Sequence, residues 1–500
     1  MPIHTLQVRR LGIDTHQEAI IYMRADCDVC RSEGFETEAR VEVRHGDRTI
    51  TATLNVVTSN LLSAGEAGLS EAAWTRLGVA EHDVVALAHP RPLESLGSVR
   101  GKVYGRPIDP AAMSAIVADV AAGRYSDIEL AAFITACAAG RLDRDEMLAL
   151  TRAMVDVGER LQWDQAPVVD KHSIGGLPGN RTTLLIVPIV AACGLTMPKT
   201  SSRAITSAAG TADTMEMLAP VALDVAGVRR VVEREGGCVV WGGGLRLSPA
   251  DDVIIRVERP LDLDAEGQLI ASVLSKKVAA GSTHVVIDVP VGPSAKVRTV
   301  AAAAQLAHDL WEVGHAVGLE VEVVLTDGLQ PIGRGIGPAL EARDVVGVLR
   351  GEVDAPQDLR ERALFLAGRV LELGGCAPAG AGRALAVGVL ADGRAWRKFT
   401  AICEAQGGMR EPSRAAHTRP VLAAAAGWVR AIDNRLLARV AKFAGAPAEP
   451  TAGLEVHVRI GAPVERGAPL FTVHAGASGE LAYALRFAER HPAIVEVSPS

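Results

Sequence analysis

The chain has 500 residues, of which 48% are hydrophobic and 22% charged, and its formal net charge is −7. This length predicts about three domains of ordinary globular composition. Aromatic residues make up only 3% and no long basic run occurs, which argues against a nucleic-acid partner. The polar first ten residues do not resemble a secretory signal, and the longest apolar run, residues 184–193, is too short to cross a bilayer. We therefore expect a cytoplasmic protein with no membrane partner.

The first 95 residues predict a small β-rich module. Short alternating segments bounded by Gly and Asp turns are typical of strands, at residues 6–12, 19–23, 38–43, 49–56 and 84–88. Residues 69–77 are predicted to be helical. Cys27 and Cys30 are closely spaced, but no second pair lies nearby to complete a four-ligand zinc site. We predict that these two cysteines lie in a loop on the solvent side.

The pattern becomes helical after a proline-containing linker at residues 90–107. Apolar residues then recur at helical spacing in three segments, 110–122, 127–138 and 144–157. Asp127 and Asp143 are the expected N-caps of the last two helices. A later helical stretch, residues 252–280, is predicted to join the same bundle.

From residue 168 onward, apolar strands alternate with Gly-rich turns and helices, which indicates a mostly parallel sheet. The predicted strands include 239–241, 285–289 and 321–326, with a long helix at 300–317. From about residue 424 the texture changes, and residues 454–474 alternate like strands in half of a biotinyl-type barrel. No Met-Lys pair is present to carry a prosthetic group, so we predict a structural C-terminal cap and no carrier role.

These segments predict a multi-domain α/β protein with four parts. They are a β-rich N-terminal module, a helical bundle domain, an α/β phosphate-binding domain with a mixed or parallel sheet, and a C-terminal α+β hammerhead-like domain. The expected boundaries are residues 1–95 for the module, 98–162 plus 249–283 for the bundle, 163–248 plus 284–418 for the α/β domain, and 419–500 for the last.

A first motif, residues 170–183, follows a predicted strand and opens a helix. Its three glycines let the backbone turn tightly and approach a ligand closely: Gly175, Gly176 and Gly179. Backbone N–H groups at a helix N-terminus bind anions, while Lys171 adds a positive charge and Ser173 a hydroxyl donor. The motif therefore predicts a phosphate-binding loop. It is not a Walker A loop, because Gly179 is followed by Asn180 and Arg181.

Two further motifs carry polar side chains that could hold a ligand. Residues 199–213 are rich in Ser, Thr and basic residues interleaved with Ala and Ile, which favours phosphate or ribose binding over a solvated loop. Residues 260–277 include Ser272 and Lys276, which are four apart and would share one face of a helix. Taken alone, the third motif would be an ordinary amphipathic helix.

The three motifs together resemble the thymidine phosphorylase family. The stretch from Ser201 to Thr211, with Asp213 and Glu216, is similar to the family signature. Similarity extends from about residue 110 to 427 and into the C-terminal part, including residues 326–331, Glu341 and residues 399–408. The resemblance implies a helical domain, an α/β domain and a C-terminal β-rich domain, with the active site between the first two.

The resemblance also implies roles for individual residues. Those that match phosphate-binding positions are Lys171, Ser173, Ser201 and Thr211. Ser272 and Lys276 match positions that hold the base, and Arg256 does so after a one-residue shift of the alignment. His172 matches a histidine beside the leaving base. The resemblance implies no cofactor and no metal. Inorganic phosphate is implied as a co-substrate.

The N-terminal block and the amino-acid sequences of the first two motifs resemble the longer, type 2 branch of the family, which includes AMP phosphorylase. In that branch Asp264 matches the proton donor. The positions that match nucleotide-binding residues are Gly176, Ser202, Arg203, Ala204, Ile205, Thr206, Ser207, Thr211, Ser272 and Lys296. Relatives of this branch assemble through the N-terminal block, so we expect a homodimer or a larger homo-oligomer.

Several functions stay open from the sequence. The first is phosphorolysis of thymidine or a related pyrimidine nucleoside, which gives thymine and 2-deoxyribose 1-phosphate. The second is phosphorolysis of AMP, which gives ribose 1,5-bisphosphate and free base. A phosphoribosyltransferase like the anthranilate enzyme would bind pyrophosphate through Mg²⁺, but no paired-acid motif lies near the Gly-rich loop. A non-catalytic assembly protein is the remaining alternative.

Overall fold

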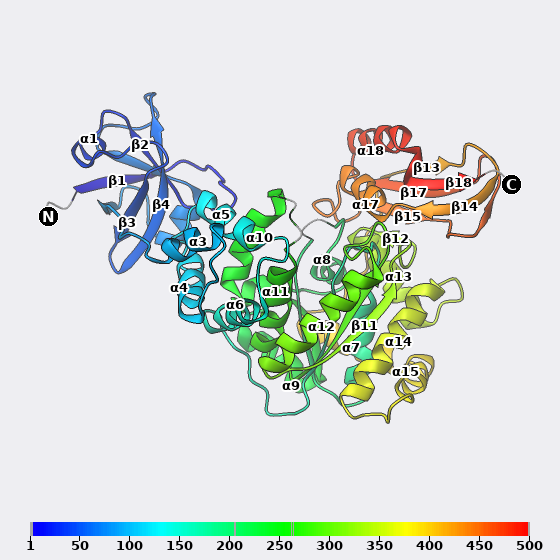
Figure 1. Cartoon of the computed structure of the whole chain (residues 1–500). Helices are drawn as coiled ribbons and strands as arrows, with labels where there is room; N and C mark the ends of the chain where they lie inside the picture. Colours follow the sequence, from blue (N-terminus) through cyan, green and yellow to red (C-terminus); the bar gives the residue numbers. More distant parts are fainter. Residues whose placement is uncertain (1–3, 205–206, 262, 264, 499–500) are drawn as a thin grey trace. The chain divides into compact units, whose positions relative to one another are not determined.

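The computed structural model describes residues 4–204, 207–261, 263 and 265–498 (Figure 1). Two compact units are present. The first comprises Met1–Leu142 and Ala250–Ala265, and the second comprises Asp143–Pro249 and Glu266–Ser500. Both contain helices and strands, which confirms the predicted multi-domain α/β class. The four domain boundaries drawn from the sequence stay a prediction.

Six strands of the first unit form a closed barrel in the order β1-β5-β2-β4-β3-β6. Closure pairs every strand on both sides, so this barrel has no free edge. The interior holds alternate side chains such as Val41 and Val43 on β3, both fully buried. The strands are β1 (His4–Arg10), β2 (Ile20–Arg24), β3 (Arg40–His45), β4 (Arg48–Val57), β5 (Glu66–Leu69) and β6 (Val84–Ala88). The N-terminal part is therefore β-rich, as predicted, with β5 as an additional strand.

The two closely spaced cysteines are buried, so their prediction as a solvent-side loop is wrong. Cys27 and Cys30 are 1% and 5% exposed. Cys27 caps helix α1 (Asp28–Glu33), and its Sγ accepts a hydrogen bond from the backbone N of Cys30 at 3.2 Å. The apolar neighbours Val29 and Phe35 belong to the barrel core and draw the short helix inward. Burial is the larger cause and the contact with Cys27 the smaller cause that raise the pKa of the Cys30 thiol to about 12.

Most helices of the bundle segment form close to where their sequence predicts them. The predicted linker at residues 90–107 is wrong in part, because residues 95–103 form a helix whose buried Val99 packs with the neighbouring helices. The helices are α3 (Ser95–Val103), α4 (Pro110–Ala121), α5 (Asp127–Cys137) and α10 (Pro249–Leu261), with α2 (Glu71–Leu77) beside the barrel and α6 (Arg144–Asp156) in the second unit. Asp143 caps α6 as predicted. The predicted cap of α5 is wrong, because Ser126 takes that position and forms a reciprocal capping box with Glu129.

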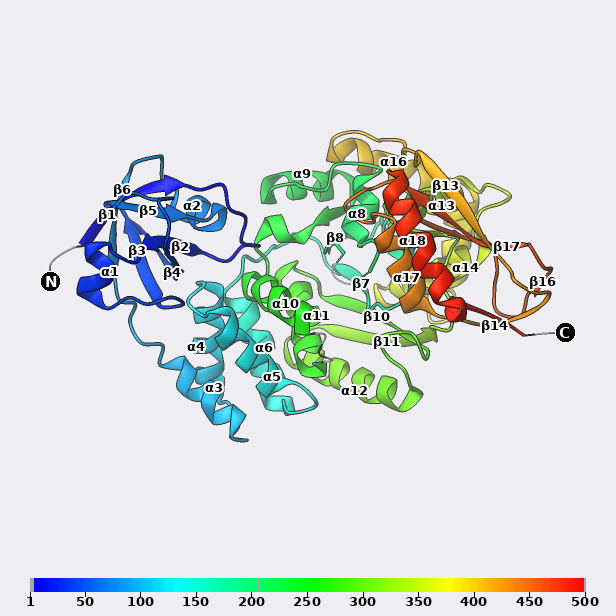
Figure 2. The same cartoon turned by 90° about the horizontal axis from the view of Figure 1, so that it is seen from above.

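A parallel sheet lies at the centre of the second unit (Figure 2). Its strands run in the order β11-β10-β7, and a parallel pair, β8 with β9, continues from it through a bridge between Val168 and Thr196. The strands are β7 (Val169–Ser173), β8 (Met197–Ser201), β9 (Gly237–Trp241), β10 (His284–Val291) and β11 (Glu320–Asp327). Since parallel strands end at the same edge, the loops that follow β7, β10 and β11 converge there.

Helices cover the sheet and supply most of its core. The apolar helix α7 is almost wholly buried, which explains why its sequence is hydrophobic on all sides. Helix α12 lies alongside β11 in both views of the chain. The helices are α7 (Thr182–Ala192), α8 (Thr211–Glu216), α9 (Val225–Glu235), α11 (Glu266–Ala279), α12 (Val300–Ala316), α13 (Pro338–Arg350), α14 (Gln357–Leu373), α15 (Gly382–Ala391) and α16 (Arg394–Gln406).

The C-terminal part of the second unit is α+β, as predicted. Two antiparallel sheets, β12-β15-β17-β13 and β16-β14-β18, surround an apolar cluster with two helices. Strand β12 (Gly335–Ile336) belongs to the α/β segment and pairs with β15. The remaining elements are β13 (His417–Leu422), β14 (Gly427–Ile432), α17 (Asn434–Phe443), β15 (Gly453–Val456), β16 (Pro463–Val464), β17 (Pro469–Ala475), α18 (Ser478–Arg490) and β18 (Val495–Ser498).

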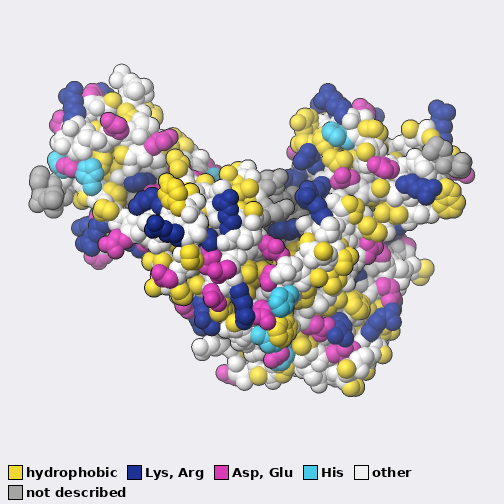
Figure 3. Space-filling model, viewed as in Figure 1, with side chains coloured by type: hydrophobic (Ala, Val, Ile, Leu, Met, Phe, Trp, Pro, Cys, Tyr) yellow, Lys and Arg dark blue, Asp and Glu magenta, His cyan; other side chains and the backbone are white. Residues whose placement is uncertain are grey.

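The surface carries charges of both signs (Figure 3). On the face shown in Figure 3, basic and acidic side chains are interspersed. Across the described ranges, each helix is too short or too polar to traverse a bilayer.

Candidate active site

A Gly-rich loop connects the end of β7 to helix α7 and lies against two neighbouring loops. Gly176 has a φ of +81°, and a Cβ added there would stand 2.3 Å from the backbone N of Lys296. Gly179 has a φ of +73°, and its Cβ would stand 2.0 Å from the carbonyl oxygen of Ile332. Glycine is therefore required at both positions by conformation and by space. The loop is held at the carboxyl edge of the sheet, between the segments that follow β10 and β11.

Lys171 places a buried ammonium group next to this loop. Its side chain is 1% exposed, and its Nζ donates to Thr182 Oγ1 at 2.9 Å. The carboxylate of Asp288, on β10, lies 3.8 Å from the same Nζ. Burial lowers the pKa of Lys171 to about 8, and the charge of Asp288 opposes this shift. The first motif thus supplies positive charge from inside the protein, where charge is weakly screened.

Asp288 connects this ammonium to the loop and to the next strand. It is fully buried, and it accepts hydrogen bonds from Asn180 Nδ2 at 3.2 Å and from Thr326 Oγ1 at 2.5 Å. Asn180 Nδ2 also contacts Ser173 Oγ at 3.3 Å. These bonds hold the Ser173 hydroxyl and the beginning of α7 in a defined position.

Asp170 is a second buried hub, which joins β7 to β8 and α11. Its carboxylate accepts from Lys199 Nζ at 3.0 Å and from Lys277 Nζ at 2.5 Å. Burial alone would raise the pKa of Asp170, but the two ammonium groups outweigh it and lower the pKa. Burial in turn lowers the pKa of Lys277. The hub therefore fixes the strand that carries Lys171 to the helix that carries Ser272.

His172 is partly exposed and lies among four positive charges. Burial, and then the ammonium groups of Lys277, Lys199, Lys276 and Lys171, hold its pKa well below the usual 6.5. The imidazole is consequently neutral near pH 7, with one N–H donor and one nitrogen acceptor.

The hydroxyl-rich second motif leads from β8 to α8. Ser201 ends β8 and Thr211 begins α8, and both are partly exposed. The carboxylate of Asp213 closes the intervening loop, because its Oδ2 accepts from the backbone N of Ala204 at 2.7 Å and of Gly210 at 2.8 Å. The exposed Ser202 and Ser207 are also in this loop, whereas Ile205 and Thr206 lie outside the described residues.

Arg203 is held by two carboxylates in the same loop. Its guanidinium contacts Asp213 at 3.2 Å and Glu216 at 2.5 and 2.9 Å, and it stacks 5.2 Å from the ring centroid of Trp241. The hydrogen bonds that Arg203 donates to Glu216 raise the pKa of Arg203, as do its other contacts with these acids. A ligand anion at this guanidinium would have to compete with both carboxylates.

The remaining sequence-predicted residues lie on later elements. Ser272 and Lys276 share one face of α11, where Lys276 Nζ donates to Ser272 Oγ at 3.2 Å. The exposed Lys296 abuts the Gly-rich loop through its backbone. In the first unit, Arg256 makes two hydrogen bonds, of 2.7 and 2.6 Å, to the carboxylate of Asp127. Asp264, the predicted proton donor, is outside the described residues.

Sequence reasoning missed the buried charges behind the motifs. Asp288, Lys199 and Lys277 were assigned no role, although each is less than 5% exposed. A carboxylate inside the apolar strand β10 was the available signal, because a charge is rarely buried without a partner.

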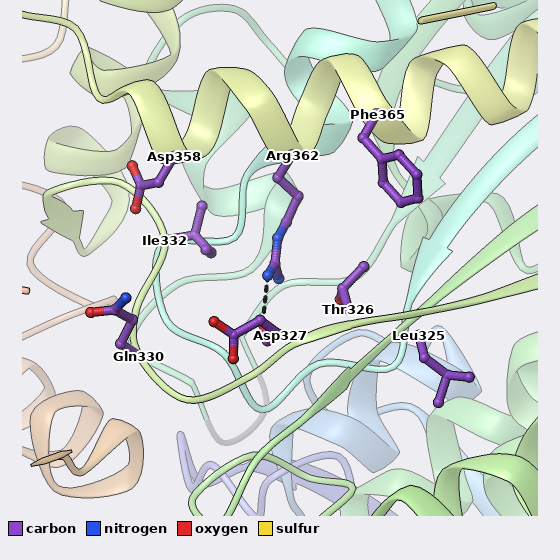
Figure 4. Close-up of a pocket in the computed structure, with 8 residues that line it drawn as sticks. All are labelled: Leu325, Thr326, Asp327, Gln330, Ile332, Asp358, Arg362 and Phe365. Carbon is purple, nitrogen blue, oxygen red and sulfur yellow. Dashed lines mark hydrogen bonds between the residues drawn. The ribbon is translucent and has the colours of Figure 1, made fainter. Parts of the chain in front are cut away.

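A pocket of about 380 Å³ opens beyond the end of β11 (Figure 4). Residues of β11, of α14 and of the segment between β11 and β12 line it. On its α14 side, Arg362 donates from Nη2 to the carbonyl oxygen of Asp327. Thr326 belongs both to this pocket and to the Asp288 network.

Three family models match consecutive parts of the chain. The helical bundle domain of a glycosyl transferase family matches residues 99–158, and the a/b domain of that family matches residues 165–396. A pyrimidine nucleoside phosphorylase C-terminal domain matches residues 428–493.

Curated relatives match nearly the whole chain, and each is named "Putative thymidine phosphorylase". The protein from Polaromonas sp. is 66% identical over 99% of this chain and 97% of its own. Those from Legionella pneumophila (strain Paris) and Maricaulis maris are 59% and 57% identical, over 96% and 99% of this chain and 93% and 95% of theirs.

A solved structure shares part of the fold. Anthranilate phosphoribosyltransferase from Thermus thermophilus aligns with a TM-score of 0.53 and 21% identity, over 62% of this chain and 99% of its own. At this identity the likeness concerns the fold alone.

Proposed function

Because this chain belongs to the thymidine phosphorylase family, we propose that it catalyses the phosphorolysis of a pyrimidine nucleoside. The reaction converts thymidine and inorganic phosphate into thymine and 2-deoxyribose 1-phosphate. The broader assignment, to enzymes that transfer a pentosyl group, rests on the family models and the relatives. A cytoplasmic location and a homo-oligomeric state are part of the proposal.

One observation carries the proposal: Lys277 Nζ donates to Asp170 Oδ2 at 2.5 Å, which joins the strand that carries Lys171 and His172 to the helix that carries Ser272 and Lys276. Lys171 lies on β7, next to the Gly-rich loop, and Lys276 lies on the Ser272 face of α11. The charges of both lower the pKa of His172. A phosphate held by the loop and a base held by α11 would thus meet near the imidazole. Displacement of a base by phosphate needs the two substrates to be held close together, so this arrangement supports the proposal.

The chemical step moves one bond and one proton. A phosphate oxygen forms a bond to C1′ of the sugar while the C1′–N bond breaks and leaves its electron pair on the base. We assign phosphate binding to Lys171, Ser173, Ser201 and Thr211, whose charge and hydroxyl groups stabilise the anion as it attacks. The neutral His172 can donate a hydrogen bond to the departing base, because an uncharged imidazole has one N–H group.

The proton itself is assigned to Asp264, on the basis of its match to the longer branch. Ser272 and Lys276 are assigned to the edge of the base, with Lys276 oriented by its hydrogen bond to Ser272. No metal takes part in this scheme, so turnover is expected to survive a chelator.

The nucleotide alternative needs a second anion site for the 5′-phosphate. Arg203 is the strongest basic candidate from the sequence, but its guanidinium is occupied by Asp213 and Glu216. Lys296, which lies against Gly176, is the other candidate. The occupied guanidinium favours the nucleoside over the nucleotide.

The experiment is release of free base, measured by liquid chromatography. The purified protein is incubated with inorganic phosphate and either thymidine or AMP, with and without EDTA. We expect thymine from thymidine, an absolute need for phosphate, and no adenine from AMP. Adenine without thymine would refute the nucleoside assignment, and base release without phosphate would refute phosphorolysis.

A matched pair of variants links the activity to the proposed site. Asp264→Asn keeps the size of the side chain and should abolish base release. Asp252→Asn makes the same change on α10 and should leave base release intact. Equal activity of Asp264→Asn and the unmodified protein would remove Asp264 from the mechanism.

A further inference from the structure

Arg181 contacts both phosphate-binding motifs at once. It follows the Gly-rich loop directly, and its Nη1 donates to the carbonyl oxygen of Asn180 at 3.3 Å. Its Nη2 donates to the carbonyl oxygen of Ala209, in the loop between β8 and α8. Its Nε contacts Thr214 Oγ1, on α8, at 3.2 Å. One guanidinium therefore spans two loops that are about 30 positions apart in the chain.

A buried carboxylate holds the guanidinium in this position. Arg181 Nε also donates to Glu341 on α13, and the two side chains are 11% and 1% exposed. The same Glu341 oxygen accepts from Thr214 Oγ1 at 2.8 Å, and its other oxygen accepts from the backbone N of Gly337 at 3.3 Å. The carboxylate balances the charge of Arg181, and its remaining contacts fix where that charge sits.

We propose that Arg181 is a positioning residue that sets the spacing between the Gly-rich loop and the loop of residues 202–210. It acts through the backbone of both loops and not by touching the substrate. Its N–H groups point to Asn180, Ala209, Thr214 and Glu341. This role rests on the proposed function, because the spacing matters only if Ser173 and Thr211 bind the same phosphate from opposite loops.

The planar shape of the Arg181 guanidinium, and not its charge alone, connects the two loops. Three nitrogens of one rigid plane reach partners in three directions. An ammonium group at this place would keep the ion pair with Glu341 but would lose at least one of the two loop carbonyls. Arg181→Lys therefore separates the positioning role from a purely electrostatic one.

The test measures phosphate and nucleoside kinetics separately in Arg181→Lys. We expect the KM for phosphate to rise by about 10- to 100-fold, the range in which displaced groups lower catalytic efficiency. The KM for the nucleoside should change much less, because Ser272 and Lys276 lie on α11, away from the Arg181 contacts. A KM for phosphate within twofold of the unmodified protein would overturn the proposal.

Two further variants guard against loss of the fold. Arg181→Met combined with Glu341→Gln removes both charges of the buried pair, and it should fold yet show the same rise in the KM for phosphate. Arg369→Met removes an arginine that also binds two carboxylates, Glu322 and Glu372. This control should lose some thermal stability and keep the KM for phosphate. A rise in that KM with Arg369→Met would show that the effect is general destabilisation.

Chemical rescue provides a readout that a merely structural role would not move. Arg181→Ala removes the guanidinium group that pairs with Glu341. Low millimolar guanidinium chloride should lower the KM for phosphate by about fivefold or more, whereas sodium chloride at the same ionic strength should not. Equal effects of the two salts would contradict the inference.

Failure of the proposed function can be told apart from failure of this inference. If the unmodified protein releases no base from any nucleoside or nucleotide, the proposed reaction is wrong. Titration calorimetry then measures the binding of inorganic phosphate to the same variants and tests the role of Arg181 alone. Unchanged phosphate affinity in Arg181→Lys would overturn the positioning role in that case too.

Discussion

The buried Lys171 ammonium makes anion binding depend on pH in a range where most lysines do not titrate. Burial lowers its pKa from 10.5 to about 8. Above this value, the charged fraction of the side chain falls by about tenfold for each pH unit. If this charge holds the anion next to the Gly-rich loop, affinity should fall by about tenfold between pH 7 and pH 9.

The contribution of Lys171 to the free energy of unfolding is expected to rise with pH while the affinity for the anion falls. A loss of affinity at high pH can therefore be told apart from unfolding. The pKa in the folded protein is lower than the 10.5 of the exposed side chain, so the unfolded chain binds more protons between about pH 8 and pH 10.5. The contribution of Lys171 to the free energy of unfolding therefore rises with pH across that window. The difference of about 2.5 pH units corresponds to about 3 kcal/mol.

The assay is calorimetric titration with sulfate from pH 6.5 to pH 9.5. Sulfate keeps its charge over this range, so a change in affinity reports on the protein and not on the ligand. Lys171→Met provides the comparison, because it should bind sulfate weakly and lose most of the pH dependence. Any slope that persists in this variant reports on other groups, of which Lys277 also has a lowered pKa.

Two results would refute this reasoning. Sulfate affinity that stays constant to pH 9 would show that Lys171 either keeps its proton or does not act on the anion. Identical slopes for Lys171→Met and the unmodified protein would assign the titration to another group. As a control, urea unfolding measures the free energy of unfolding at each pH and shows whether the protein is folded where binding is measured.

Two further predictions concern the frame of the site. Asp170→Asn leaves two buried ammonium groups without their carboxylate, and urea unfolding at pH 7 should show a loss of about 3–5 kcal/mol; a loss below about 1 kcal/mol would contradict the central place given to this residue. Gly176→Ala forces a Cβ into the backbone of Lys296 and should cost about 1–2 kcal/mol from the positive φ alone, with a clear loss of phosphate affinity by calorimetry. Gly175→Ala meets no atom within 4 Å, so equal losses of affinity in the two variants would point to strain and not to the close contact.

Local sequence patterns predicted those elements whose formation depends on near neighbours. Alternation predicted most of the barrel strands, and the order of apolar strand, glycines and helix predicted the loop after β7. Asp143 was identified as a cap because an N-cap is decided within four residues. The same rule failed at α5, where Ser126 and Asp127 are adjacent and the reciprocal bond with Glu129 decides between them.

Contacts between distant parts of the chain were not predictable from spacing. Asp170 and Lys277 are 107 positions apart, and only the fold brings them together. Lys276 and Lys277 are neighbours, but adjacent positions on a helix point about 100° apart. One therefore turns to Ser272 and the other into the interior. The burial of Cys27 likewise follows from the barrel core, which the short segment around it does not reveal.

The Asp170 hub has a consequence for how the site could respond to its ligands. By linking β7 to α11 within one compact unit, its contacts constrain the distance from the strand that carries Lys171 to the helix that carries Lys276. If these two elements hold the two substrates, as proposed, the separation of the two binding sites is set when the protein folds and not by the arrival of either substrate. Under the proposed function, a nucleoside that does not match this separation would bind without reacting, and the Asp170 contacts would then select substrates by their length.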